Sequence, residues 1–157
     1  MRPSEVASAS ALVRESFARL ASADWEDQAR QRFLDGCDPD SLGRKIAAAT
    51  YSAGAFRGDR LLGFLLMPSP AVLGMLFVHP NSVRQGIATA LWESARYRLK
   101  SGFPEVTTVE LDSTPLALGF YRTLGFVPLS AEYVREGARA VRMACWLPAR
   151  ELGAEMS

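Results

Sequence analysis

The stretch FVHPNSVRQGIATALWESARYRL, from Phe77 to Leu99, reads as the end of an apolar strand, a polar turn and a long helix. The turn carries Gly86 and then Ala88 where the helix begins, and such small residues let another group approach the backbone. The first N–H groups of a helix lack partners within it, and the helix dipole adds partial positive charge there. The stretch therefore predicts an anion site, to which Arg84 adds a full charge.

The same turn could also be an ordinary strand–helix connection that uses a glycine, and the stretch alone leaves that alternative open. Two other kinds of phosphate site can be tested against the chain. The pattern Gly-x-x-x-x-Gly-Lys-Ser/Thr does not occur, which excludes a P-loop. The Gly-x-Gly-x-x-Gly pattern is absent too, which disfavours a dinucleotide-binding fold.

The segments before this stretch predict helices followed by strands. Apolar residues recur at helical spacing in three segments: 4–23 with Ser4 as N-cap, 24–36 with Asp24 as N-cap and Gly36 as stop, and 38–50 starting near Pro39. The run 51–67 predicts a hairpin that turns at residues 57–60, because two extended runs flank a Gly-containing tetrapeptide. The run 71–78 is apolar on both faces, which indicates a central, covered strand.

The segments after the long helix, which we expect to span about Ile87 to Lys100, alternate again. The β-branched run 106–111 predicts a strand, and 113–125 predicts a helix that begins near Pro115 and ends at Gly125. Residues 126–134 and 138–148 read as strands around a second hairpin at 135–137. We therefore expect one α/β domain over residues 1–150 and a frayed tail at 151–157.

Composition restricts the classes of function. The chain has 157 residues and a net charge of +1, which argues against broad nucleic-acid binding. No apolar run reaches membrane-spanning length, and the first ten residues lack the apolar core of a signal peptide, so we expect a cytoplasmic protein with no membrane partner. Cys37, Cys145 and His79 form no metal-like spacing, so we expect no metal.

Two motifs, taken in order and at this separation, resemble the GNAT superfamily of acetyl-CoA-dependent N-acetyltransferases. The first is Gly86-Ile87-Ala88, which matches the end of the family's pyrophosphate loop, and the second is FYRTLGF around Tyr121. The resemblance covers about residues 2 to 147. It implies a mixed central sheet of about six or seven strands flanked by helices, with a V-shaped splay between two parallel central strands.

The resemblance also implies which residues hold the co-substrate, acetyl-CoA. Backbone groups at the end of the run 71–78 would hold the pantetheine arm, the loop would hold the diphosphate, and Thr114 stands where many relatives carry a cofactor-binding Asn. The cofactor residues implied are Leu76, Phe77, Val78, Arg84, Gln85, Gly86, Ile87, Ala88, Thr89 and Thr114. Val83 departs from the family's Gln or Arg, and Thr114 could equally cap the following helix.

Two residues are candidates for the chemistry. Glu110 is a single acid in a β-branched strand, where burial without a purpose is costly, and similar enzymes carry a catalytic Glu on this strand. A solvated Glu110, or one paired with an arginine, is an equally good reading. Tyr121 matches the family's tyrosine and would protonate the departing thiolate, although it could also serve packing alone. Asp112 and His79 are the reserve candidates for the base.

The resemblance implies transfer of an acetyl group from acetyl-CoA to a primary amine of a small molecule, peptide or protein by direct attack. The sequence does not identify the acceptor, and it does not distinguish acetyl from a longer acyl group. Two alternatives stay open: a non-catalytic acyl-CoA-binding or sensing module on the same fold, and a protein-interaction domain. A homodimer is compatible with each of them.

Overall fold

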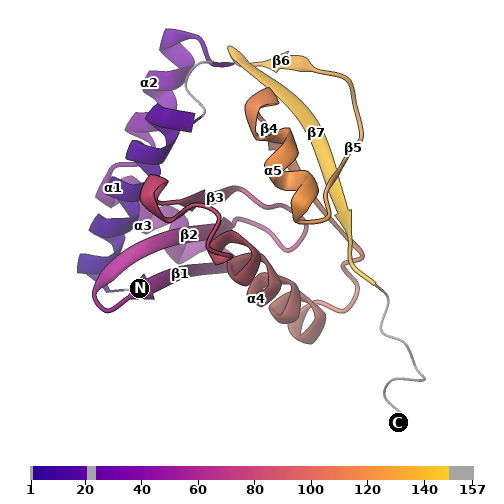
Figure 1. Cartoon of the computed structure of the whole chain (residues 1–157), viewed down its shortest axis with the longest axis horizontal. Coiled ribbons are helices and arrows are strands. Elements are labelled where there is room, and N and C mark those ends of the chain that lie inside the picture. The colour runs from indigo at the N-terminus through magenta and orange to yellow at the C-terminus, as the bar shows by residue number, and fades with distance from the viewer. Residues whose placement is uncertain (1, 21–23, 149–157) are drawn as a thin grey trace.

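The computed structural model describes residues 2–20 and 24–148. It contains helices on both sides of strands that run through the middle of the molecule (Figure 1). The helical elements are α1 (Pro3–Leu20), α2 (Asp27–Asp35), α3 (Pro39–Ala48), the 3-10 turn η2 (Pro80–Ser82), α4 (Ile87–Gly102), the 3-10 turn η3 (Pro115–Ala117) and α5 (Leu118–Thr123). The strands are β1 (Tyr51–Arg57), β2 (Arg60–Met67), β3 (Met75–Val78), β4 (Thr108–Ser113), β5 (Val127–Pro128), β6 (Tyr133–Arg135) and β7 (Ala138–Trp146).

The strands form two antiparallel sheets. The first has the order β1-β2-β3, and the second has the order β4-β7-β5, with β6 also paired to β7. A two-residue turn joins β1 to β2 and places Arg57 opposite Arg60 at the end of the hairpin. β3 and β4 are therefore the neighbouring edge strands of two sheets.

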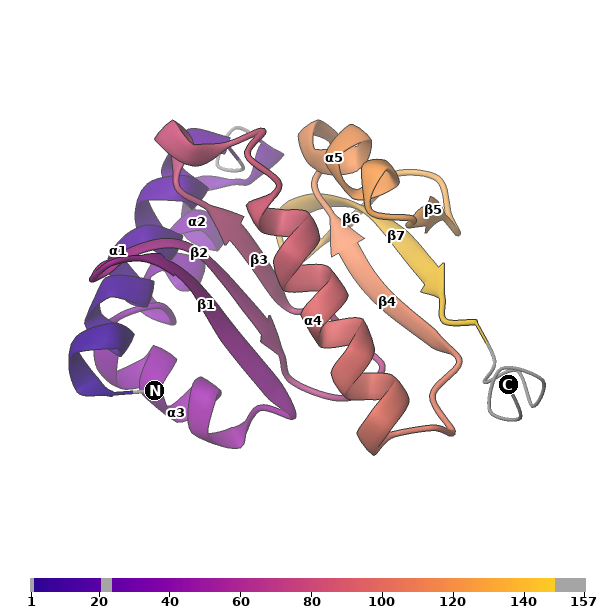
Figure 2. The same ribbon diagram turned by 60° about the horizontal axis from the view of Figure 1, so that its bottom comes forward.

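One short parallel contact connects the two sheets. The Glu110 N–H donates to the carbonyl of Ala71 at 2.8 Å, and the Leu73 N–H donates to the carbonyl of Glu110 at 3.0 Å. Beyond this contact β3 and β4 run in the same direction but do not pair, and Figure 2 shows their arrowheads apart with the first turn of α4 between them. The V-shaped splay that the family resemblance implies is confirmed, as is the single α/β domain expected from the pattern of helices and strands.

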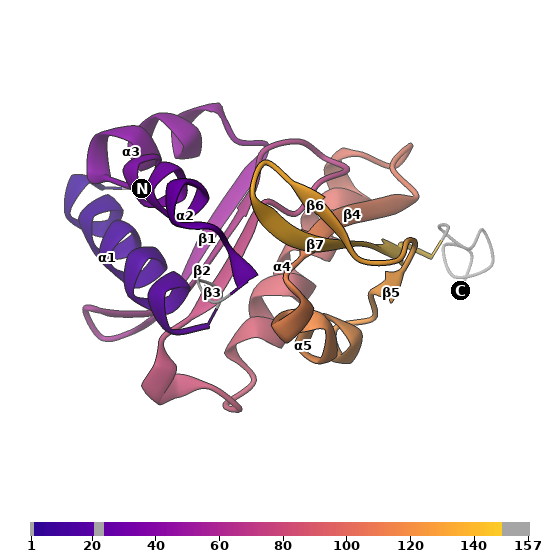
Figure 3. The same cartoon turned by 90° about the horizontal axis from the view of Figure 1, so that it is seen from above.

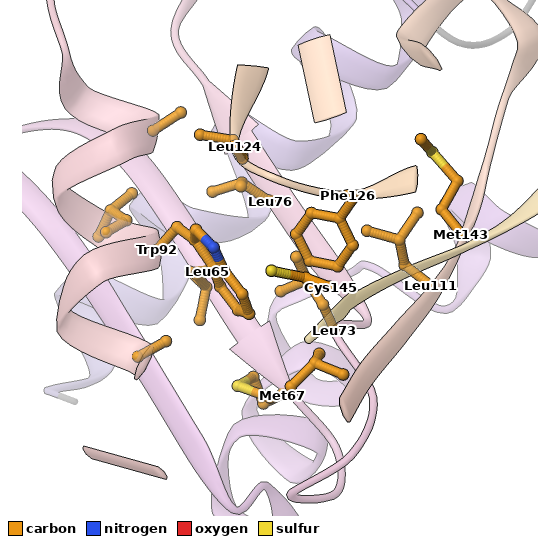
Figure 4. Packing of buried hydrophobic residues seen from close by; sticks show 14 of the residues in the cluster. Leu65, Met67, Leu73, Leu76, Trp92, Leu111, Leu124, Phe126, Met143 and Cys145 are labelled. Carbon is orange, nitrogen blue, oxygen red and sulfur yellow. The ribbon is translucent and has the colours of Figure 1, made fainter. Parts of the chain in front are cut away.

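The helices cover the strands in two layers. Figure 3 shows α1, α2 and α3 on one side of the strands and α4 and α5 on the other. The larger core lies on the α4 and α5 side, where Trp92 and Phe126 pack with ring centroids 5.0 Å apart (Figure 4). A second core, built around Val13, Leu42 and Phe64, lies under α1 and α3. Alternate residues of β3 therefore face the two cores, with Leu76 and Val78 on the α4 side and Met75 and Phe77 on the α1 and α3 side.

The predicted elements are largely confirmed, but several boundaries are wrong. The expected central strand 71–78 is shorter and lies at the edge of its sheet, since β3 begins at Met75 and residues 71–73 contact Glu110 of β4 instead. The expected helix 113–125 consists of η3 and α5. The first helix begins at Pro3, so Ser4 lies within it and does not cap it. α2 begins at Asp27 and not after Asp24, because the preceding residues pair with the second hairpin through a 2.8 Å bond from the Glu26 N–H to the Gly137 carbonyl. The expected strand 126–134 is divided into β5 and β6. The predicted tail, 151–157, lies outside the described residues.

Candidate functional site

The splay exposes two strand edges to a ligand. β2 pairs with one edge of β3, from Leu66 opposite Met75 to Gly63 opposite Val78, and no described strand pairs with the other edge. β4 is likewise paired only on the side of β7 over Thr108–Ser113, apart from the contact at Glu110. An unpaired strand edge presents backbone donors and acceptors. The backbone of Leu76, Phe77 and Val78 is therefore available to a ligand that carries amide groups.

The N-terminus of α4 lies beside the open end of the splay. The first hydrogen bond at the start of the helix runs from the Ala90 N–H to the Gly86 carbonyl at 3.0 Å. The N–H groups of residues 87–89 precede it, and no side chain caps them. Gly86 has a φ of 78° and Arg84 a φ of 65°, so two residues of the turn adopt the left-handed conformation. This geometry exposes helix N–H groups and places an arginine close to them.

A glycine of β2 positions this helix start. A Cβ added at Gly63 would lie 2.7 Å from Cγ2 of Ile87 and 3.0 Å from Cδ1 of Leu91. These distances are shorter than normal van der Waals contact, so a larger residue at position 63 would require the Ile87 and Leu91 side chains, or the start of α4, to move. The sequence alone did not reveal this requirement, because Gly63 looks there like any strand glycine.

Thr114 carries a hydroxyl without a partner. The residue precedes η3, but its side chain makes no capping hydrogen bond. Its Oγ1 is buried, and no group of the described structure forms a hydrogen bond with it. Because a buried hydroxyl without a hydrogen bond is costly, this position favours a ligand group over a helix cap as the missing partner.

Tyr121 lies on the α4 side of the second sheet. Its ring packs edge-on against Phe120 and Phe126, with centroids 5.1 and 5.9 Å away, and it borders the larger core. The side chain is half-buried, and burial raises its pKa to about 12. The phenol is therefore neutral at physiological pH and offers a hydrogen-bond donor.

Glu110 belongs to a group of paired charges on the opposite side of β4. Val109 and Leu111 face the larger core, so Glu110 and Asp112 point away from α4. Arg142 of β7 lies 3.5 Å from a carboxylate oxygen of Glu110 and 3.2 Å from one of Asp112. Glu110 is therefore paired with an arginine, one of the readings that its sequence context left open.

Two further residues complete this group. The Arg135 guanidinium lies 3.0 Å from Oδ2 of Asp112, the oxygen that Arg142 also contacts, and the Tyr133 hydroxyl donates a hydrogen bond to Oδ1. This hydrogen bond, with the nearby carboxylate charge, raises the pKa of Tyr133. We call these residues the carboxylate–arginine cluster: Glu110, Asp112, Tyr133, Arg135 and Arg142. Arg142 could have been noticed in the sequence, since it is a lone charge in the apolar run VRMAC, as Glu110 is in its own strand.

Aromatic side chains connect the splay to the segment before α2. Phe77 of β3 lies 6.3 Å from Phe33, which in turn lies 4.2 Å from Phe17 and 5.5 Å from Trp25. Trp25 forms a bridge with Ala138 at the start of β7. This contact brings residues 24–26 to the second hairpin, on the side of the splay that faces away from α4.

His79 has a structural role at the start of η2. Its Nδ1 accepts a hydrogen bond from the Asn81 N–H at 3.1 Å, and its backbone N–H donates to the Leu62 carbonyl at 2.7 Å.

The two cysteines, Cys37 and Cys145, are buried, and burial raises the pKa of both thiols. In the described part of the chain, no group of three His, Cys, Asp or Glu side chains could hold a metal ion. None of the described helices is long and apolar enough to cross a membrane.

Comparison with solved structures identifies molecules of the same fold. The chain is similar to a GCN5-related N-acetyltransferase from Rhodopseudomonas palustris, with a TM-score of 0.76, 18% identity, and coverage of 94% of this chain and 92% of the other. It is also similar to the PaiA N-acetyltransferase from Thermoplasma acidophilum, solved in complex with coenzyme A, with a TM-score of 0.74, 18% identity and coverage of 93% and 95%.

A third similar structure is the ribosomal-protein-S18-alanine N-acetyltransferase from Escherichia coli, with a TM-score of 0.62, 18% identity and coverage of 97% and 94%. At these identities the three structures establish the fold. The sequence itself matches the profile of the acetyltransferase (GNAT) domain over residues 21–147, which is most of the chain. The splay, the uncapped start of α4 and this match together show that the chain belongs to the GNAT family of acetyltransferases.

Proposed function

We propose that this acyltransferase moves the acetyl group of acetyl-CoA to a primary amine of a small molecule, peptide or protein. The observation that carries the proposal is the unpaired edge of β3, which leads to the uncapped N-terminus of α4 at Gly86. A thioester arm with two amides and a diphosphate needs such a site, a strand edge followed by a helix N-terminus.

The backbone performs most of the binding in this proposal. The pantetheine amides pair with the free edge at Leu76, Phe77 and Val78. The diphosphate accepts hydrogen bonds from the α4 start, where Gln85, Gly86, Ile87, Ala88 and Thr89 line the turn and Arg84 adds its charge. The exposed Val83 contributes no charge, which weakens the site by one side chain and leaves the backbone donors in place.

Thr114 supplies a further hydrogen bond to the bound arm. Its unpartnered Oγ1 supports this role, because a hydroxyl that found no partner in the protein gains one from the ligand.

In the proposed reaction the amine attacks acetyl-CoA directly, without an acetyl-enzyme intermediate. The neutral amine attacks the thioester carbon, the carbonyl oxygen becomes an oxyanion stabilised by a backbone N–H of the splay, and the C–S bond then breaks. Glu110 accepts the proton that the amine loses, directly or through water, and Tyr121 donates to the sulfur as CoA departs. The two residues lie on opposite sides of β4, so different groups accept the proton that the amine loses and supply the proton that the thiolate takes up.

The test has a binding part and a catalytic part. Calorimetry with CoA should show one site per chain, and absence of binding would overturn the proposal. A panel of primary amines of different charge and size, assayed with acetyl-CoA for thiol release, should then identify acceptors. Mass spectrometry must find the acetyl group on the amine, since thiol release alone could reflect hydrolysis.

A further inference from the structure

The turn between β1 and β2 contacts the loop that precedes α4. Nη2 of Arg57 donates a 3.3 Å hydrogen bond to Oε1 of Gln85, and Nη2 of Arg60 lies 3.4 Å from Nε2 of His79. Gln85 belongs to the turn assigned above to the diphosphate. Figure 3 shows the turn between β1 and β2 and the loop between β3 and α4 on the same side of the molecule. Two arginines of the first sheet therefore border the proposed binding site of CoA.

These arginines are close to one another as well. Arg57 and Arg60 are directly opposite in the register of the hairpin. Side chains at such positions point to the same face of the sheet, and like charges there destabilise the pair. An anion that binds both guanidinium groups would remove this repulsion.

The arginines at this end of the described structure form no ion pair with a carboxylate. Within residues 2–20 and 24–148, no ion pair includes Arg57, Arg60 or Arg84. Asp59 lies in the turn itself and is not paired with either arginine. Two arginines of the hairpin therefore contact the loop that carries Arg84, and Asp59 is the one acid of the hairpin turn.

CoA contains two separate phosphate groups, a diphosphate and a 3′-phosphomonoester on the ribose. The diphosphate takes the α4 N-terminus and Arg84 in the function proposed above. A phosphomonoester carries about −1.5 to −2 charges at pH 7 and needs cations of its own. The planar guanidinium matches phosphate oxygens in bidentate geometry, which makes arginine the appropriate residue type.

We propose that Arg57 and Arg60 bind the 3′-phosphate of CoA, so that the β1–β2 turn forms a second phosphate subsite beside the α4 N-terminus. The inference rests on the proposed function, because it concerns the same ligand. It adds a selectivity that the fold alone does not impose: the enzyme should distinguish CoA from dephospho-CoA, which lacks only this phosphate.

The experiment measures the affinity of both ligands by calorimetry in the wild type and in the double variant Arg57→Gln, Arg60→Gln. The wild type should bind CoA at least about 10-fold more tightly than dephospho-CoA, as expected for two charge-assisted contacts. The double variant should lose this preference and bind dephospho-CoA as the wild type does. Arg98→Gln, an exposed arginine of α4 without an ion pair in the described structure, is the matched control and should keep the preference.

The possible results separate the two proposals. Equal affinity of the wild type for CoA and dephospho-CoA would overturn the inference and leave the proposed function intact. So would a double variant that weakens both ligands by the same factor, since the arginines would then act only by supporting Gln85 and His79. A wild type that binds neither ligand would overturn the proposed function, and the inference with it. Urea unfolding without ligand should show no loss of stability in the double variant, because the two charges repel each other.

Discussion

Two charged regions border the splay, and they differ in how their charges are balanced. In the carboxylate–arginine cluster, Arg142 contacts two carboxylates and Arg135 one, at 3.0 to 3.5 Å. Near the β3–α4 loop, Arg57, Arg60 and Arg84 have no carboxylate partner in the described structure. A region whose charges are already paired gains little from an added anion, whereas unpaired cations beside free N–H groups favour one.

Because of this difference, we expect the two regions to affect different quantities, the affinity for CoA and the turnover. The loop region should determine the affinity for CoA, because its charges and backbone donors are free. The cluster should affect turnover and the acceptor, because its groups hold one another in place. Variants on each side should therefore change one quantity and leave the other nearly constant.

Tyr121 lies in neither region, and its variant should give the largest effect. Tyr121→Phe keeps the ring packing against Phe126 and removes only the hydroxyl. We expect turnover to fall by about 100-fold, within the usual range for the loss of a general acid, with little change in CoA affinity. Stopped-flow measurement of the acetyl-transfer step tests this. Tyr97→Phe, which alters an exposed tyrosine of α4, is the control.

The pH dependence of Tyr121 sharpens the same test. Its pKa of about 12 lies above the ordinary value near 10, so the folded protein favours the neutral phenol. The stability that this raised pKa contributes is complete below pH about 10 and is lost as the pH rises through 12. We therefore expect ionisation of Tyr121 to cause no loss of activity between pH about 8 and 10. If Tyr121→Phe transfers the acetyl group at the wild-type rate, and acetyl transfer is the rate-limiting step, Tyr121 takes no part in the reaction.

Gly86→Val should produce the next largest effect, and on affinity. The added side chain has open space around it, so the variant should fold, but the φ of 78° is unfavourable for a β-branched residue. The turn should relax and move its N–H groups away from the diphosphate, and CoA affinity should fall by about 30-fold, equivalent to about 2 kcal/mol of lost hydrogen bonding to a charged group.

Gly58→Val is the matched control for that variant when the ligand is dephospho-CoA, because this ligand lacks the phosphate assigned above to the β1–β2 turn; the affinities of both variants are therefore compared with dephospho-CoA. Gly58 has a φ of 61° with no heavy atom near its added Cβ, so it imposes the same kind of backbone cost in the β1–β2 turn. Calorimetry on both variants, after urea unfolding has established that each is folded, separates backbone strain from the loss of phosphate donors. Equal affinity in the two variants would refute the role given to the α4 start.

Glu110→Gln should have a smaller effect, and on turnover. We expect a loss of about 10-fold at low pH, where neutral amine is scarce, and unchanged affinity for CoA. The expected loss is below the usual range for a general base, because the Glu110 side chain is 39% exposed and water can replace part of its role. The measurement is the pH–rate profile of kcat/KM. A profile identical to that of the wild type would show that Glu110 is not the base, and water held by Asp112 would be the next candidate.

The sequence predicted most of the local structure and less of what depends on distant contacts. The turn at Gly86, the hairpin at 57–60 and the strand that carries Glu110 all follow from residue types and spacing. The start of α2 does not, because residues 24–26 pair with the second hairpin, more than 100 residues away in the chain. Similarly, nothing in the local sequence of Arg57 indicates that its side chain reaches Gln85.

The candidate site divides in the same way. Gly86 and Tyr121 could be selected from motifs, since the roles proposed for them depend on a local turn and on a helix next to a strand. The pairing of Arg142 with Glu110 and Asp112 depends on the register of β4 against β7, where Glu110 lies opposite Ala144 and Asp112 opposite Arg142. A register of this kind is set by the packing of both sheets, and residue spacing along one strand does not define it.

Arg84 should give the smallest effect and tests whether single charges or backbone donors dominate in the loop region. It is exposed and has a φ of 65°, so Arg84→Ala would remove the charge and also keep a strained backbone. Asn tolerates the left-handed conformation, so Arg84→Asn removes the charge with little strain. We expect CoA affinity to fall by about 3-fold at low salt, since one exposed charge contributes less than about 1 kcal/mol. The loss should nearly disappear in high salt, where exposed charges are screened. Calorimetry at both ionic strengths measures this. A loss of affinity as large as that of Gly86→Val, or one that salt does not reduce, would show that the Arg84 side chain holds the diphosphate and the helix start does not. The difference between the two charged regions would then depend on side-chain charge alone.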